Sequence, residues 1–381
     1  MDKDIKRIVT GVISLILLLP VISLLLILPA GAEADGGGMS ASVYETYAGP
    51  GERLLIVSNK GYRREYPENS LDAVKRAAEL GADIVKIDLQ TAADGGFTLS
   101  SGETLLSVLE REDLSCMLML SDAWQNRDAL YGLVKDKYLD RVIFQFEGVK
   151  PDETAGWMSG LDAKPEVCLW HKGNVVFGAR SFVRKSAEAG ISSLWLASRV
   201  PYSISFSKAV TAPASGNSRL MLDLTDGENS GRLRADSQVW YDEALCRGFN
   251  MILTDDVPGA KRYLERCENA REALAAAFDS CVNGFTLPDF TSDVYASYKK
   301  AYDLAKADAE ILLSDGGAAA SEMENAAAAL YRARDNIVRD YDELKTGKAG
   351  VTVTPGRIAA AVIAVAAVCA FEIFIYKRKQ K

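Results

Sequence analysis

The chain has 381 residues, with 44 lysines and arginines against 52 aspartates and glutamates, so it is mildly acidic. This length can hold one large domain and a smaller one. No long basic run occurs away from the two ends, which argues against a nucleic-acid partner. The six cysteines are scattered without a CxxC pair, which argues against a structural zinc site or a disulfide framework. The single histidine, His171, excludes any mechanism that needs two histidines.

Both ends of the chain carry apolar segments. Residues 8–28 are long enough to cross a bilayer, for which about 20 residues suffice, and residues 358–376 form a second such segment. Basic residues lie outside both segments, so the positive-inside rule predicts two transmembrane helices with both termini in the cytoplasm. The bulk of the chain is then expected outside the plasma membrane, with the lipid bilayer as a partner. Cleavage of the first segment as a signal peptide is the alternative, because LPAGAEA supplies small residues for a cleavage site.

Between these segments, short apolar runs alternate with amphipathic helical stretches. The expected strands are residues 54–58, 83–89, 116–120, 141–146, 166–170, 192–197, 219–224 and 250–254. Eight such strands separated by helices predict an α/β fold, a (β/α)8 TIM barrel. An open doubly wound sheet is the structural alternative, because pattern reading fixes the number of strands poorly.

Beyond residue 263 the composition changes to alanine-rich helix. Three amphipathic stretches, separated by the turn signals GFTLPDF and SDGG, predict a three-helix bundle. The expected domains are a cytoplasmic tip with a transmembrane helix or signal peptide (1–31), a linker (32–50), the barrel (51–266), the bundle (267–345), a second linker (346–357), and a transmembrane helix with a basic tail (358–381).

The first third of the barrel carries a series of short motifs in fixed order. They are NKG (59–61), PEN (67–69), GAD (81–83), KID (86–88), DG (94–95) and SG (101–102). Residues 54–105 thereby resemble the start of a glycerophosphodiester phosphodiesterase domain, and a weaker resemblance extends to about residue 266. The family has His-Arg-Gly, Pro-Glu-Asn, Gly-Ala-Asp, Glu-x-Asp, Asp-Gly and His-Asp at these places. The resemblance implies a TIM barrel and phosphoric diester hydrolysis.

The chemistry that this resemblance implies needs two histidines for proton transfer, an arginine for the phosphate, and acidic ligands for calcium or magnesium. The family-equivalent catalytic positions are here Asn59, Lys60, Ser101 and Gly102. The metal-ligand positions hold Lys86, Asp88 and Met119, of which only Asp88 is acidic. No cofactor is therefore expected, and calcium or magnesium would be needed only if the chain were an active enzyme.

Lys86 and Asp88 are two residues apart on an expected strand, so both side chains point to the same side. The Lys86 ammonium can replace the missing cation beside Asp88, and it would repel a divalent metal. A distance of about 3 Å from this ammonium to an Asp88 oxygen, within charge-assisted bonding range, would support a site without a metal. Beside them, Lys60, Arg63 and Arg64 are candidates for binding an anionic ligand. A solvated run of charges is the alternative for the arginines.

Two further residues are weighed as parts of a site. His171, in WHKG, follows an expected strand and is a ligand-binding candidate if it faces the carboxyl-terminal end of the barrel, where such folds keep their sites. A structural or solvated histidine is the alternative. Asp223 is also weighed: its side chain either points into the carboxyl-terminal end of the barrel or anchors a loop through hydrogen bonds.

The helical region resembles a FIVAR module, a small bundle found in bacterial surface proteins. GFTLPDF followed by the alanine- and leucine-rich helices carries this resemblance. The module implies contact with carbohydrate or cell wall, and a spacer is the alternative.

Three functions remain open at this stage. The first is a membrane-anchored, extracytoplasmic phosphodiesterase-like protein that binds a phosphodiester or polyol phosphate, such as a glycerophosphodiester, lipid headgroup or cell-wall polymer, without cleaving it. The second is an active phosphoric diester hydrolase with an altered site. The third is an architectural cell-envelope protein.

Overall fold

The computed structural model describes residues 39–48, 53–93, 95–171, 178–196, 207–214, 216–225, 238–289 and 293–345. Its centre is a closed barrel of parallel strands, in the order β1, β10, β9, β8, β7, β6, β5, β2. These strands are β1 (Leu55–Asn59), β2 (Ile84–Ile87), β5 (Met117–Leu120), β6 (Val142–Glu147), β7 (Glu166–His171), β8 (Ser193–Leu196), β9 (Arg219–Asp223) and β10 (Met251–Thr254). Pairing of β1 with both β10 and β2 closes the sheet and excludes the open doubly wound alternative. The predicted barrel is thus confirmed.

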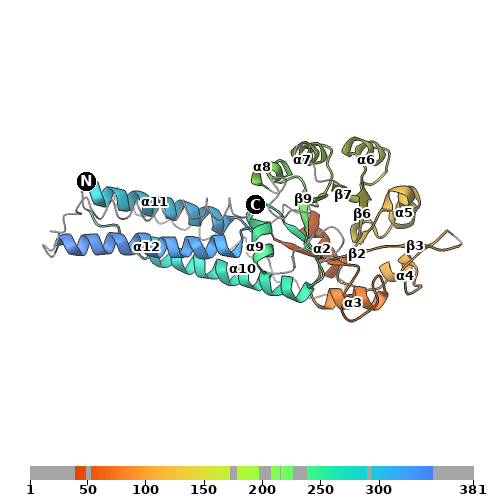
Figure 1. The fold of residues 1–381 in the computed structure, drawn as a ribbon, viewed down its shortest axis with the longest axis horizontal. Coiled ribbons are helices and arrows are strands. Elements are labelled where there is room, and N and C mark those ends of the chain that lie inside the picture. The colour runs from red at the N-terminus through yellow and green to blue at the C-terminus, as the bar shows by residue number, and fades with distance from the viewer. Residues whose placement is uncertain are drawn as a thin grey trace, which may run out of the picture.

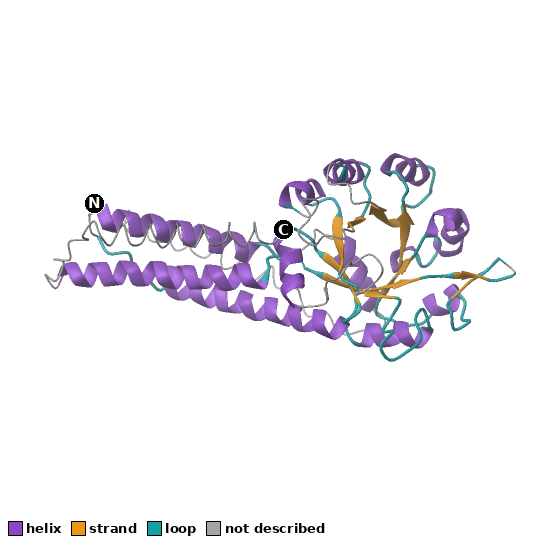
Figure 2. Ribbon diagram, viewed as in Figure 1, coloured by secondary structure: helices purple, strands orange, loops and turns teal. Residues whose placement is uncertain are grey.

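Helices lie outside the strands, as Figures 1 and 2 show. They are α3 (Leu71–Glu79), α4 (Leu105–Leu109), α5 (Arg127–Val134), α6 (Pro151–Met158), α7 (Ala179–Glu188), α8 (Lys208–Thr211), α9 (Gln238–Cys246) and α10 (Val257–Phe278). A small hairpin of β3 (Gln90–Thr91) and β4 (Phe97–Thr98) follows β2. Helix α3 illustrates the local logic: the Ser70 hydroxyl caps its first turn by accepting from the Ala73 amide, and its apolar side faces the barrel.

The strand register sorts the inward-facing side chains into layers of four, contributed by alternating strands. Two middle layers are apolar except for one serine: Ile84, Ile143, Ser193 and Met251, then Val57, Met119, Cys168 and Met221. Toward the carboxyl ends of the strands the layers become polar: Lys86, Gln145, Trp195 and Leu253, then Asn59, Ser121, Trp170 and Asp223. We call this last layer and the residues beyond it the mouth of the barrel. The sequence pattern therefore places charge and hydrogen-bonding groups at one end of an apolar core.

Helix α2 (Met39–Ala48) covers the opposite, amino-terminal end of the barrel. Tyr47 is buried among the inward-facing apolar side chains, and its hydroxyl donates to the Ser193 hydroxyl at 2.9 Å. The buried guanidinium of Arg219 donates to the carbonyl oxygens of Tyr47 at 2.8 Å and of Thr46. A cation at these carbonyls also complements the helix dipole. Part of the predicted 32–50 linker is therefore a helix that belongs to the barrel.

Helices α10, α11 (Asp293–Ser314) and α12 (Ala320–Lys345) form a bundle that extends away from the barrel, as Figure 1 shows. Small alanines and a few larger apolar residues are buried between them, among them Leu274, Ala309, Met323, Leu330 and Ile337. Helix α10 both covers β1 and runs on into the bundle. The predicted domain boundary between residues 266 and 267 therefore falls inside one continuous helix.

No helix of the described residues is both long and apolar enough to cross a membrane. The long helices α10, α11 and α12 carry acidic and basic residues along their length. This finding contradicts the predicted fold class where it adds a transmembrane helix on each side of the barrel. It also contradicts the predicted location in the plasma membrane with both termini in the cytoplasm. The two apolar segments on which these predictions rest, residues 8–28 and 358–376, lie outside the described residues.

Candidate active site at the barrel mouth

The loop after β1 turns sharply against α3. Lys60 and Gly61 both have positive φ, at 60° and 78°. A Cβ on Gly61 would lie 2.6 Å from the carbonyl carbon of Ala73 in α3, closer than such atoms can approach. The glycine of NKG is therefore required by backbone geometry and by close packing, whatever the chemistry of the site.

Gly61→Ala should destabilise the protein by about 2–5 kcal/mol, because the strain of a positive φ adds to the clash with the α3 backbone. Urea unfolding would measure the loss. Gly102→Ala is the matched control: Gly102 has φ 96°, but a Cβ there meets nothing within 4 Å. We expect the control to lose only the conformational strain, about 1 kcal/mol. Equal losses in the two variants would contradict the role assigned to Ala73.

Asp88 is the centre of the charged cluster at the mouth. The Lys86 ammonium lies 3.2 Å from its Oδ1 atom and the Lys60 ammonium lies 3.3 Å from its Oδ2 atom. Lys60 also contacts Glu68 Oε1 at 3.3 Å. Burial alone would raise the pKa of Asp88, but Lys86, the Ser121 hydroxyl and Lys60 outweigh it and lower the pKa to about 2. Both carboxylate oxygens thus face ammonium groups, and Lys86 lies on the same side as Asp88.

Asn69 of the PEN motif holds Asp88 in place. Its side-chain oxygen accepts from the Asp88 backbone amide at 2.9 Å, and its amide nitrogen lies 3.5 Å from Asp88 Oδ2. Asn69 itself has φ 57°, a left-handed conformation that asparagine tolerates better than most residues. Its backbone amide donates to the Lys60 carbonyl at 2.9 Å. The motif therefore fixes Lys60 and Asp88 relative to each other.

The arginines of the first loop meet the end of the last strand. The Arg63 guanidinium bonds to Asp255, and Asn59 Nδ2 donates to the other oxygen of that carboxylate at 3.3 Å. Arg64 lies 3.2 Å from Asp256 Oδ1. These pairs connect the residues after β10 to the β1–α3 loop, and they place Arg63 beside Asn59.

The other side of the mouth is aromatic. Trp170 and Trp195 stack with their ring centroids 4.3 Å apart and their planes 12° from parallel. The Lys86 ammonium lies 5.9 Å from the Trp195 ring centroid. Asp223 completes the uppermost layer and accepts from the Thr225 amide at 3.0 Å and its hydroxyl at 2.7 Å. Burial raises the pKa of Asp223 against the opposing effect of these hydrogen bonds. Asp223 thus anchors a loop while lying at the mouth.

Several predicted site residues lie away from this cluster. The Ser101 hydroxyl accepts from the Leu71 amide at 3.0 Å and bonds to Glu103, so it supports the start of α3. Gly102 forms the adjoining turn with φ 96°. Met119 is fully buried in an apolar layer. His171 packs edge-on against Phe182 of α7, with centroids 4.7 Å apart, because it follows the inward-facing Trp170 and so points outward.

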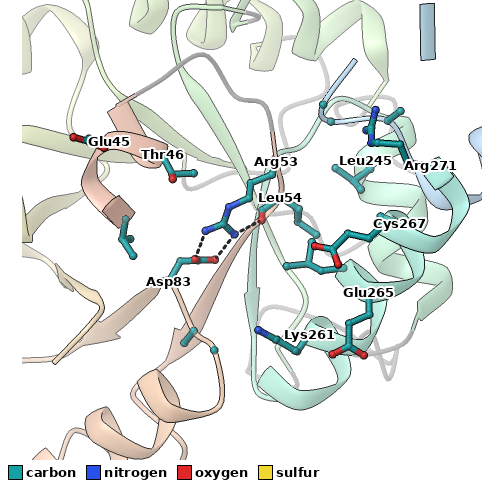
Figure 3. Close-up of a pocket in the computed structure, with 18 of the residues that line it drawn as sticks. Glu45, Thr46, Arg53, Leu54, Asp83, Leu245, Lys261, Glu265, Cys267 and Arg271 are labelled. Carbon is teal, nitrogen blue, oxygen red and sulfur yellow. Dashed lines mark hydrogen bonds and ion pairs between the residues drawn. The ribbon is translucent and has the colours of Figure 1, made fainter. Parts of the chain in front are cut away.

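A cavity of about 1230 Å³ lies at the amino-terminal end of the barrel, where α2, the start of β1, α10 and the α11–α12 turn meet. Figure 3 shows its charged lining, in which Arg53 pairs with Asp83 at 2.7 Å. Arg271 donates to the Asp315 carbonyl at 2.8 Å and so supports the turn after α11. None of the sequence-predicted site residues lines this cavity.

Residues 60–140 match the family model described as the glycerophosphoryl diester phosphodiesterase family. This part of the chain is therefore similar to a glycerophosphoryl diester phosphodiesterase domain. A glycerophosphodiester phosphodiesterase from Caldanaerobacter subterraneus is 38% identical over 53 residues, which are 14% of this chain and 22% of the relative. The chain thus matches about a fifth of that relative's length.

Two solved structures of this name align with the chain over most of their own length. A glycerophosphoryl diester phosphodiesterase from Parabacteroides distasonis is 11% identical, with a TM-score of 0.46 over 59% of this chain and 92% of its own. A glycerophosphodiester phosphodiesterase from Thermotoga maritima is 16% identical, with a TM-score of 0.42 over 54% of this chain and 96% of its own.

The resemblance implies a calcium or magnesium site at the place of Lys86 and Asp88. Both Asp88 oxygens already face ammonium groups, and Lys86 stands where the resemblance implies the first acidic ligand. Two unit charges 4 Å apart interact by about 4 kcal/mol at an effective dielectric constant of 20, so these lysines strongly oppose a divalent cation. The described residues hold no group of three or more His, Cys, Asp or Glu side chains suited to a metal. The residues present do not fit the ion.

Sequence reasoning missed several residues that the phosphodiesterase-like domain gathers here: Asn69, Asp255, Gln145, Trp170 and Trp195. Asn69 lies in a quoted motif, and Asp255 directly follows the last strand. Period-two alternation would have placed Gln145 and the tryptophans on the inward face, had it been extended to the polar and aromatic positions. Nothing in the sequence pairs Arg63 with Asp255, because that contact depends on closure of the barrel.

Proposed function

We propose that the mouth of the barrel binds a phosphodiester or polyol-phosphate ligand without cleaving it. The double ion pair at Asp88 is the observation that carries this proposal. Lys86 and Lys60 take up both oxygens of the one surviving acid, in place of a metal ion. The basic side chains that suit a phosphate are kept, while the metal ligands that would activate it are not.

The proton-transfer groups that cleavage needs are replaced as well. Asn59 stands at the first histidine position, and an amide does not exchange protons as an imidazole does. Ser101 stands at the second, where its hydroxyl is engaged with Leu71 and Glu103. Binding without turnover is what remains when the cationic groups are retained and the general acid and base are lost.

A phosphate ligand would compete with carboxylate side chains for the basic groups at the mouth. Lys60 contacts the exposed Glu68 and Arg64 contacts Asp256, both at the surface end of the mouth. Exposed pairs of this kind contribute only about 0–1 kcal/mol, so a phosphate can displace them at little cost. Lys60 and Arg64 are then free to hold a ligand oxygen through charge-assisted hydrogen bonds.

Purified protein should release no glycerol phosphate from glycerophosphoglycerol, with or without added calcium or magnesium, because Lys60 and Lys86 oppose a divalent cation at Asp88 and Asn59 stands at the first histidine position. The measurement is a coupled assay for glycerol 3-phosphate over long incubations. Turnover that disappears in Asp88→Ala would contradict the proposal and establish an active hydrolase.

Binding is measured separately by thermal unfolding. A ligand at a hundredfold excess over its Kd should stabilise the folded protein by about 2.7 kcal/mol. Lack of any stabilisation by glycerophosphoglycerol, glycerol 3-phosphate or inorganic phosphate would instead favour an architectural role.

A further inference from the structure

Gln145 and Trp195 each carry a buried hydrogen-bond donor without an acceptor in the part of the chain that the structure describes. These donors are the side-chain amide nitrogen of Gln145 and the indole nitrogen of Trp195. Gln145 is 2% exposed and Trp195 is 4% exposed. Proteins rarely leave such groups unsatisfied, because each buried donor loses its bond to water without gaining another. A bound polar ligand that accepts hydrogen bonds would satisfy both donors.

Both donors lie in the same layer as the Lys86 ammonium. The register places Lys86 on β2, Gln145 on β6 and Trp195 on β8 at one level, with Leu253 of β10 as the fourth member. Lys86 is also within 5.9 Å of the Trp195 ring centroid. Three side chains that carry N–H groups therefore face the barrel axis from different sides.

This layer offers donors and hardly any acceptor. The Gln145 side-chain oxygen already accepts from the Asp122 amide at 3.0 Å, which orients the amide nitrogen the other way. Of the carboxylates above this layer, Asp88 is held by two lysines and Asn69, and Asp223 accepts from Thr225. A guest that matches the layer must supply acceptors and, opposite an ammonium, negative charge. An oxyanion does both, and a cation does neither.

We propose that this layer binds the terminal phosphate of a polyol monophosphate, with Lys86, Gln145 and Trp195 as its ligands. The inference rests on the proposed function and makes it narrower. To reach this depth the ligand passes the layer of Asn59, Ser121, Trp170 and Asp223, where the two stacked tryptophans occupy one side. A phosphomonoester has one organic substituent, so only one chain must pass through that layer when its phosphate is bound below. A phosphodiester has two substituents, and both would have to pass.

The test compares three probes by isothermal titration calorimetry on the full-length protein: glycerol 3-phosphate, inorganic phosphate and glycerophosphoglycerol. Wild type is expected to bind glycerol 3-phosphate more tightly than glycerophosphoglycerol. Trp195→Phe and Gln145→Met should each weaken glycerol 3-phosphate binding by about tenfold or more, because each removes one hydrogen bond to a charged group. Gln145→Met also removes the acceptor of the Asp122 amide, and Trp195→Phe removes part of the stack on Trp170, so the melting temperature of each free variant is measured beside its affinity.

Trp157→Phe is the matched control. Trp157 lies on α6 outside the barrel, where its indole donates to Asp128 at 2.8 Å, so its replacement should leave the Kd unchanged. Unchanged affinity in both Gln145→Met and Trp195→Phe overturns the inference, and so does tighter binding of the diester. Should one variant fail to fold, the other decides.

The same titrations separate the two proposals. In one outcome, Lys60→Met abolishes binding of glycerophosphoglycerol while Gln145→Met and Trp195→Phe bind all probes as wild type does. That result would support ligand binding at the mouth and contradict phosphate binding by the deeper layer. If wild type binds none of the three probes, both proposals fall.

Discussion

Lys86→Glu should create a divalent-cation site where the protein now holds an ammonium. Without metal, this variant places two carboxylates on the same side of β2 and leaves Asp88 with Lys60 as its remaining ammonium partner. We expect a loss of about 3 kcal/mol in stability, as when one partner of a partly buried ion pair is removed. Calcium or magnesium at a hundredfold excess over its Kd should return about 2.7 kcal/mol. Thermal unfolding with and without metal measures both effects.

Lys86→Gln is the control for this substitution. It removes the same positive charge but adds no carboxylate, so we expect it to be destabilised without rescue by metal. Wild type should show no metal effect, because Lys60 and Lys86 both face Asp88. Stabilisation of wild type and Lys86→Glu by the same amount would show that the lysines do not oppose the ion, and would remove the main support for binding without cleavage.

Arg219→Met should strongly destabilise the amino-terminal end of the barrel. Arg219 is 3% exposed, and its guanidinium serves carbonyl oxygens of Thr46, Tyr47 and Arg53. Methionine fills a similar volume but leaves these carbonyls without their donor. Since an unsatisfied buried acceptor costs about 1–3 kcal/mol, we expect a total loss of about 3–5 kcal/mol.

Urea unfolding measures that loss, and amide hydrogen exchange should show faster exchange in residues 39–48 in particular. Arg111→Met is the comparison: Arg111 pairs at the surface with Asp113 at 2.7 Å, and such a solvent-screened pair contributes little to stability. If Arg219→Met cost no more than Arg111→Met, the guanidinium would not be what holds α2 on the barrel.

The barrel could be predicted from the sequence because its strands are short apolar runs at regular spacing, a local signal. The contact between Lys86 and Asp88 could be predicted for the same reason, since two residues of one strand share a face. His171 shows the limit of this reasoning. Its position at a strand end was visible, but its direction depends on which neighbour faces inward, and Trp170 takes that place.

Contacts between distant parts of the chain had no local signal. Helix α2 has the sequence MSASVYETYA, without an acidic first turn or a basic last turn, and it is held by an arginine from β9. The pairing of Arg63 with Asp255 likewise needs the last strand to return to the first. The unpaired donors of Gln145 and Trp195 emerge only when the register brings β6 and β8 to one level.

Helix α10 has a mechanical consequence. Its 22 residues run without interruption from the wall of the barrel into the bundle, a length of about 33 Å at 1.5 Å per residue. Such a helix is stiff, so the packing of α10 on β1 sets the orientation of the bundle relative to the mouth. A chain cut after residue 266 would lose the outer half of α10 together with α11 and α12, which pack against it. Turning the bundle against the barrel would require α10 to bend or to leave β1.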